Sequence, residues 1–196
     1  MSVGRGTHLA RIYRQMQERQ HNLNVLRDLE DVYGADVWAV VKPTESEIID
    51  MGVQSDTARR LDLWLESKYD LDVGYLVEVK RTRVLDGTRA ALQTTLSADA
   101  AVGAVTLSVA DETGFRSGDA LVVWDEASAW EETRVRSVGT ERLTLHTDCA
   151  LQAAYSTGAV VRASRLYRVM DQRIPEDVGP YRVALLQHVA SRMVVD

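Results

Sequence analysis

The feature that most constrains the fold is a run of short alternating segments between residues 92 and 164, separated by turn-forming residues. Apolar and polar residues alternate in "GAVTLSVA", and the alternation resumes after the glycines of "DETGFRSGDALVVW". Successive side chains of a β-strand point to opposite faces, so this pattern predicts half-buried strands. Because the gaps are short and contain no helical pattern, we predict a self-contained antiparallel β-barrel or sandwich over residues 92–164.

The sequence on both sides of this run alternates in the same way. We expect strands at Asp36–Pro43, where a proline ends an apolar run, at Ala58–Lys68 and at Gly74–Arg81. Further strands are expected at Leu166–Met170 and from Tyr181 onward. A domain can be inserted into a loop whose two ends lie close together. We therefore predict that residues 34–91 and 165–196 form one discontinuous small β-barrel, into which residues 92–164 are inserted.

The first thirty residues have a different pattern from the rest of the chain. Apolar residues recur at steps of three, four or seven in the first thirty residues, as in Leu9, Ile12, Tyr13 and Met16, with polar residues between them. Such spacing is typical of one face of a helix, and Thr7 could be its N-cap. The predicted fold class is therefore mainly β (α+β), with an N-terminal helix over residues 1–33.

The composition gives no signal for catalysis. The run Leu92–Glu126 contains no His, Cys or Lys, and Cys149 is the single cysteine of the chain. The four histidines lie in separate segments and none has a partner at metal-ligand spacing: His8, His21, His146 and His188. No phosphate-binding glycine loop or nucleophile motif occurs. We expect no enzyme activity, no metal and no cofactor, and, because no apolar run has membrane-spanning length, no membrane partner.

Charge limits the role of nucleic acid. The net charge of −6 argues against tight binding to phosphates, which needs an excess of Lys and Arg. Two dense basic spots are candidates for contact with a partner or with DNA phosphate: Arg59, Arg60, Lys80, Arg81 and Arg83. The alternative for both spots is a solvated strand end.

The block "DVWAVVKPTESEIIDMGVQSDTARRLDLWLESKYDLDVGYLVEV", together with "RLYRVMDQRI" and "PYRVALLQHV", resembles the head-closure (stopper) or head–tail joining proteins of tailed bacteriophages. The likeness covers about half of the chain. Separately, the "T-G-F-x-x-G-D" turn and the later "E-T-x-x-V-x-S-V" resemble a small β-module that recurs in phage virion proteins. The chain differs from compact family members in its large insertion and in its predicted N-terminal helix.

The resemblance implies a structural protein of the virion neck, made in the host cytoplasm. Family rings have six or twelve copies, with a portal or adaptor protein above and a tail terminator or tail tube below. In the family a loop after the first strand points into the DNA channel; here it would be residues 44–57. The residues that would line the channel in transient contact with packaged double-stranded DNA are Glu45, Glu47, Ile48, Ile49, Asp50, Met51 and Asp56.

Two other interpretations stay open at this point. The first is a tail terminator or minor tail protein. The second is a carbohydrate- or host-surface-binding module, because Trp124 and Trp130 could stack on sugar rings, although paired aromatic residues can equally pack in a core.

Overall fold

The computed structural model describes residues 8–15, 29–43, 60–85, 87–125, 130–174 and 181–189. Their regular structure is β-strand apart from a short 3-10 helix at Thr147–Cys149. The described chain divides into two compact units, one containing residues 8–15, 29–82 and 166–189, the other residues 83–165. The prediction of a mainly β protein is confirmed.

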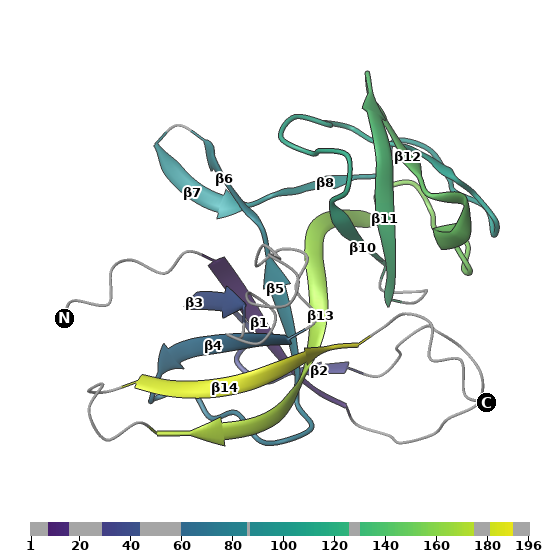
Figure 1. Ribbon diagram of the computed structural model, residues 1–196. Helices are drawn as coiled ribbons and strands as arrows, with labels where there is room; N and C mark the ends of the chain where they lie inside the picture. Colours follow the sequence, from purple (N-terminus) through teal and green to yellow (C-terminus); the bar gives the residue numbers. More distant parts are fainter. Residues whose placement is uncertain are drawn as a thin grey trace. The chain divides into compact units, whose positions relative to one another are not determined.

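The first unit is a closed antiparallel barrel. The barrel strands are β1 (His8–Gln15), β3 (Val37–Pro43), β4 (Arg60–Glu66), β5 (Leu76–Lys80), the second half of β13 (Val160–Arg173) and β14 (Tyr181–His188). A short outer strand, β2 (Leu29–Asp31), pairs with β1. The order around the barrel is β14-β4-β3-β1-β5-β13, and pairing between β13 and β14 closes it (Figure 1). The small antiparallel barrel predicted from the flanking segments is therefore present.

Strict alternation explains the barrel core. In β4, Leu61, Leu63 and Leu65 are at most 1% exposed, whereas the residues between them are partly exposed. They pack with inward residues of the neighbouring strands, including Ile12 and Val77. Each fully buried leucine contributes about 1.5–3 kcal/mol relative to an exposed one, so this face fixes the register of the strand.

The predicted N-terminal helix is wrong within the described residues. His8–Gln15 is strand β1, with Ala10 and Ile12 facing the core, and Leu29–Asp31 is strand β2. The spacing of Leu9, Ile12 and Tyr13 fits one helix face, but in the strand Ala10 and Ile12 face the core, while Leu9 and Tyr13 on the other face are 8% and 9% exposed. Pairing with strands on both sides decides in favour of the strand, because tertiary context overrides weak local propensity.

The second unit contains a two-stranded sheet and a larger set of paired strands. These are β6 (Thr82–Leu85), β7 (Thr88–Ala91), β8 (Gln93–Thr95), β9 (Thr106–Ser108), β10 (Ala120–Trp124), β11 (Trp130–Gly139), β12 (Arg142–Leu145) and the first half of β13. The pairing runs β8-β13-β10-β11-β12-β9, and the bridge between Leu96 and Val109 links β9 back to β8. The strands of this larger set thus pair in a cycle.

The "T-G-F-x-x-G-D" turn has a clear structural basis. Phe115 is 6% exposed and packs in the core of the second unit. The Asp119 carboxylate accepts a 2.7 Å hydrogen bond from the Arg116 amide, and Gly118 has φ +89°, which favours glycine. The turn therefore places one aromatic side chain inside while reversing the chain.

Strand β13 differs from the prediction in its continuity. The sequence predicts one strand before residue 164 and another from Leu166, whereas the structure has a single strand, Val160–Arg173. Ser164 lies inside it and is 4% exposed.

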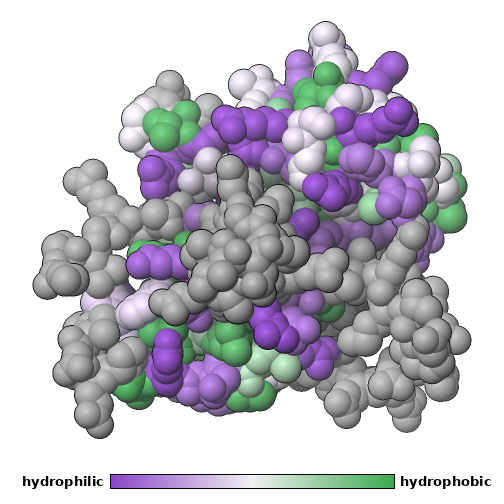
Figure 2. All heavy atoms as spheres, in the orientation of Figure 1, coloured by the Kyte–Doolittle hydropathy of each residue, from purple (hydrophilic) through white to green (hydrophobic). Residues whose placement is uncertain are grey.

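On the face shown in Figure 2, apolar residues of the described chain lie in small groups among hydrophilic ones, as on an ordinary solvated surface.

Candidate functional site: a polar cluster on the barrel

The loop predicted to line a channel lies outside the described residues, and so does Arg59. The channel-lining role therefore stays a prediction for the residues of this loop: Glu45, Glu47, Ile48, Ile49, Asp50, Met51 and Asp56.

The basic residues that the structure describes have different environments. Arg60 is exposed at the start of β4, and Arg81 is partly exposed. Arg83 donates hydrogen bonds of 2.9 Å both to the Asp111 carboxylate and to the Thr113 carbonyl. Lys80 is 2% exposed. Lys80 and Arg83 are therefore held in contacts within the chain, whereas Arg60 is exposed.

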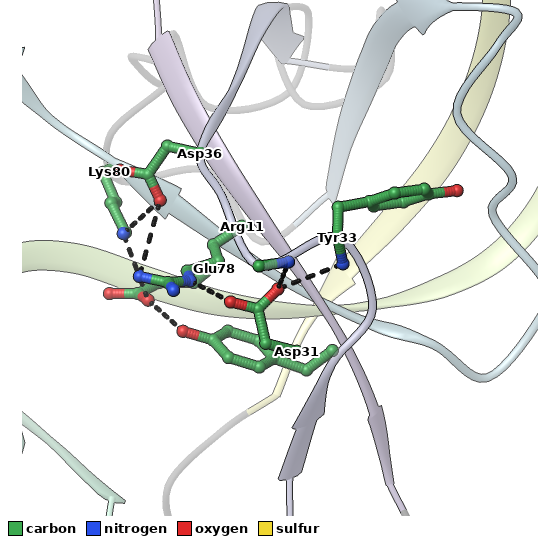
Figure 3. Close-up of polar contacts among 8 residues, drawn as sticks. Arg11, Asp31, Tyr33, Asp36, Glu78 and Lys80 are labelled. Carbon is green, nitrogen blue, oxygen red and sulfur yellow. Dashed lines mark hydrogen bonds and ion pairs between the residues drawn. The ribbon is translucent and has the colours of Figure 1, made fainter.

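Lys80 belongs to a polar cluster on the outer side of β1 and β5, which we define as Arg11, Tyr13, Asp31, Asp36, Glu78 and Lys80 (Figure 3). Val77 and Val79 pack in the barrel core, so Glu78 and Lys80 face the other way. Glu78 is 0% exposed, so this outer face of β5 is also buried. Alternation alone predicts a solvated face here, which is why the sequence did not single out the cluster.

Short contacts connect the members of the polar cluster. The Lys80 ammonium lies 2.6 Å from the Asp36 carboxylate and 4.0 Å from that of Glu78. The Tyr13 hydroxyl donates a 2.9 Å hydrogen bond to Glu78. The pairs Lys80–Asp36 and Tyr13–Glu78 join residues that are 44 and 65 positions apart in the sequence. The cluster thus ties β1 and β5 to the segment before β3.

Asp31 forms the other end of the polar cluster. It accepts a 2.5 Å hydrogen bond from the Arg11 guanidinium and hydrogen bonds from the backbone amides of Tyr33 and Gly34 (Figure 3). Burial alone would lower the pKa of Arg11, but the hydrogen bond to Asp31 and the nearby negative charges outweigh it and raise the pKa. Arg11 is therefore a fixed cation whose role in this site is to bind carboxylates.

The second unit contains a buried carboxylate of its own. Glu131 is 3% exposed and accepts hydrogen bonds from the backbone amides of Gln152 (2.7 Å) and Ala153 (3.2 Å) and from the Tyr155 hydroxyl. Burial raises the pKa of Glu131, and these three donors partly offset that shift. Burial and the Glu131 charge both raise the pKa of Tyr155. The arrangement fixes the segment that follows the 3-10 helix and leaves Tyr155 a hydrogen-bond donor.

The two tryptophans proposed to stack on sugars lie opposite each other on β10 and β11. Trp124 and Trp130 are register partners; Trp130 is 6% exposed and Trp124 is partly exposed. The Trp130 ring is almost fully buried and has no free face for a sugar, so the pair does not offer two open rings. This geometry favours packing over carbohydrate binding.

Among the described residues no group of three or more His, Cys, Asp or Glu side chains is arranged to hold a metal ion. The described part of the chain also has no helix long and apolar enough to cross a membrane. No protein-family model matches the sequence, and a search of curated proteins gives no significant match.

Proposed function

We propose that this chain is a structural protein of the bacteriophage neck, where copies of it form a ring between the portal or adaptor and the tail. The ring would close or continue the DNA channel after packaging. The proposal begins from the resemblance to head-closure and head–tail joining proteins, and the described barrel adds support to it.

One observation carries most of that support. The two separate blocks of sequence that resemble the family, residues 36–83 and 166–189, supply neighbouring strands of one closed barrel. Strand β14 pairs with β4 over seven residues, from Tyr181 opposite Glu66 to Gln187 opposite Arg60. The barrel is therefore completed by strands that lie on both sides of residues 83–165, as expected for a barrel interrupted by an insert.

The polar cluster fits a structural role better than a reactive one. Each of its carboxylates has a hydrogen-bond or ion-pair partner within 4.0 Å. Buried charges paired in this way hold strands in register, and removal of one partner is costly. For a ring subunit that withstands the pressure of packaged DNA, such connections between strands would be useful.

Channel lining is the part of the proposal that rests on sequence alone. A ring of acidic loops at residues 44–57 would repel the DNA backbone and would not displace its counterions, so DNA would slide past without sticking. In this proposal the apolar residues Ile48, Ile49 and Met51 close the lumen by contact among subunits. The second unit, as an inserted virion module, would widen or brace the ring.

Particles assembled without the chain provide the test. We expect electron micrographs of such particles to show heads and separate tails, with packaged DNA lost from heads, and supply of the chain in trans to restore complete particles. Complete tailed particles with normal DNA content in its absence would contradict a neck function. Tails of abnormal length on otherwise joined particles would point instead to the tail-terminator alternative.

A further inference from the structure

Strand β1 is the structural basis of this inference. It lies between β3 and β5 in the barrel and also pairs with β2, so the described pairings of this strand are all with later parts of the chain. Its side chains are well buried: Ala10 is 0% and Ile12 1% exposed. Without β1, the barrel would have an open gap between β3 and β5.

The connection from β1 to the rest of the chain is much longer than the pairing requires. Gln15 and Leu29 are register partners in an antiparallel pair. Two strands that meet in this way are usually joined by a hairpin loop of about two to five residues. Here thirteen residues, 16–28, separate them in the sequence. A fully extended connection of that length spans roughly 45 Å, many times the roughly 5 Å between the Cα atoms of register partners.

The contacts of β1 with its acceptor are specific in charge and register. Arg14 lies opposite Glu30, with guanidinium-to-carboxylate distances of 3.0 and 2.5 Å. Arg11 binds Asp31 at 2.5 Å, and Tyr13 binds the buried Glu78. A β1 strand from an identical chain would make every one of these contacts equally well. Exchange between identical copies therefore loses no contact and is decided by effective concentration, which is high between neighbours in a ring.

We propose that in the assembled protein β1 of each copy inserts between β3 and β5 of the adjacent copy, so that every barrel is completed by its neighbour's N-terminal strand. The partner is a second copy of this chain. The inference rests on the proposed ring, since exchange of this kind around a closed ring links all subunits through their cores.

Cysteine cross-linking across the β1–β2 pair tests the exchange. In a Cys149→Ser background, chains with Arg14→Cys are co-expressed with chains with Glu30→Cys and are then oxidised or joined with a short bismaleimide. Directly opposed residues of an antiparallel pair lie close enough for such a link. We expect a covalent dimer of two 21.8 kDa chains. The double variant Arg14→Cys/Glu30→Cys should give a ladder of linked chains under denaturing, non-reducing conditions.

The matched control is the double variant Ser137→Cys/Thr144→Cys, which joins register partners of the β11–β12 hairpin. Because only a short turn separates these strands, this link must form within one chain and should give monomers. If the Arg14/Glu30 double variant also gives only monomers while native mass shows rings, the exchange is overturned and the neck proposal survives. Linked chains without closed rings would keep the exchange and contradict the ring.

A shortened connection gives a second, independent readout. Replacing residues 16–28 by a four-residue Gly/Ser loop still permits β1 to fold back as a hairpin but prevents it from reaching a neighbour. We expect this variant to keep the far-ultraviolet circular dichroism of a β protein and to lose the cross-linked species. Cross-linking undiminished by the short loop would contradict the exchange.

Discussion

The substitution Lys80→Met tests whether the polar cluster stabilises the barrel. Lys80 is 2% exposed, and its ammonium lies 2.6 Å from Asp36 and 4.0 Å from Glu78, which is 0% exposed. Methionine keeps most of the side-chain volume and removes the positive charge. The buried Glu78 carboxylate then loses the Lys80 ammonium at 4.0 Å but keeps the hydrogen bond from Tyr13.

The expected loss follows from the burial of the pair. Removing one partner of a buried ion pair costs about 3–5 kcal/mol, because the remaining charge stays in a poorly solvated site. Asp36 is 25% exposed and can be partly resolvated, so the lower end, about 3 kcal/mol, applies. With a urea dependence of about 1–3 kcal/mol/M, the unfolding midpoint should fall by roughly 1–3 M.

Urea unfolding followed by tryptophan fluorescence measures this loss, and hydrogen exchange of β5 peptides assigns the transition to the barrel. Lys68→Met is the matched control, because Lys68 pairs with Glu66 at the surface with side-chain exposures of 63% and 54%. Exposed pairs contribute about 0–1 kcal/mol, so the control midpoint should barely move. If Lys80→Met and Lys68→Met shift the midpoint equally, the reasoning about the polar cluster is refuted.

Three further predictions concern single side chains. The folded-state pKa of Glu131 is raised, so this group contributes stability that is present below its ordinary pKa of about 4.3 and is lost as pH rises through the folded-state pKa. The wild type should therefore lose stability relative to Glu131→Gln between pH 4 and pH 7. A difference in thermal midpoint that does not change with pH would contradict this. Glu141 has φ +51°, so Glu141→Gly should relieve backbone strain and raise the free energy of unfolding by about 0.5–1 kcal/mol in urea titrations. A loss of stability would show that the contacts of the Glu141 side chain outweigh the strain of its backbone. Leu63→Ala, at a position 0% exposed in the barrel core, should cost about 2–5 kcal/mol by the same titration, and a cost below about 1 kcal/mol would mean that the core is loosely packed there.

Much of the fold follows from local alternation. Strands β3, β4 and β5 were predictable because one set of alternate residues is apolar and turn formers or prolines end the runs, as in Leu61, Leu63 and Leu65. Strand β1 was not, since the spacing of Leu9, Ile12 and Tyr13 fits one face of a helix and not the two-residue period of a strand. The choice between them is made by pairing with β3 and β5, which no local window contains.

The polar cluster could not be predicted for a similar reason. Glu78 and Lys80 occupy alternate positions of β5, which on pattern alone indicates a solvated face. All five residues of that strand are buried, so both faces are covered. Arg11 reaches the same place from β1 and Asp36 from the segment before β3, and only the barrel topology brings these charges together.

Native mass spectrometry of the purified chain, alone and mixed with a candidate portal protein, tests the neck-ring proposal most directly. The proposal predicts a closed assembly of six copies of the 21.8 kDa chain, about 131 kDa, or of twelve copies, about 262 kDa, in at least one of the two samples. A chain that remains monomeric in both samples and does not bind the portal would contradict it.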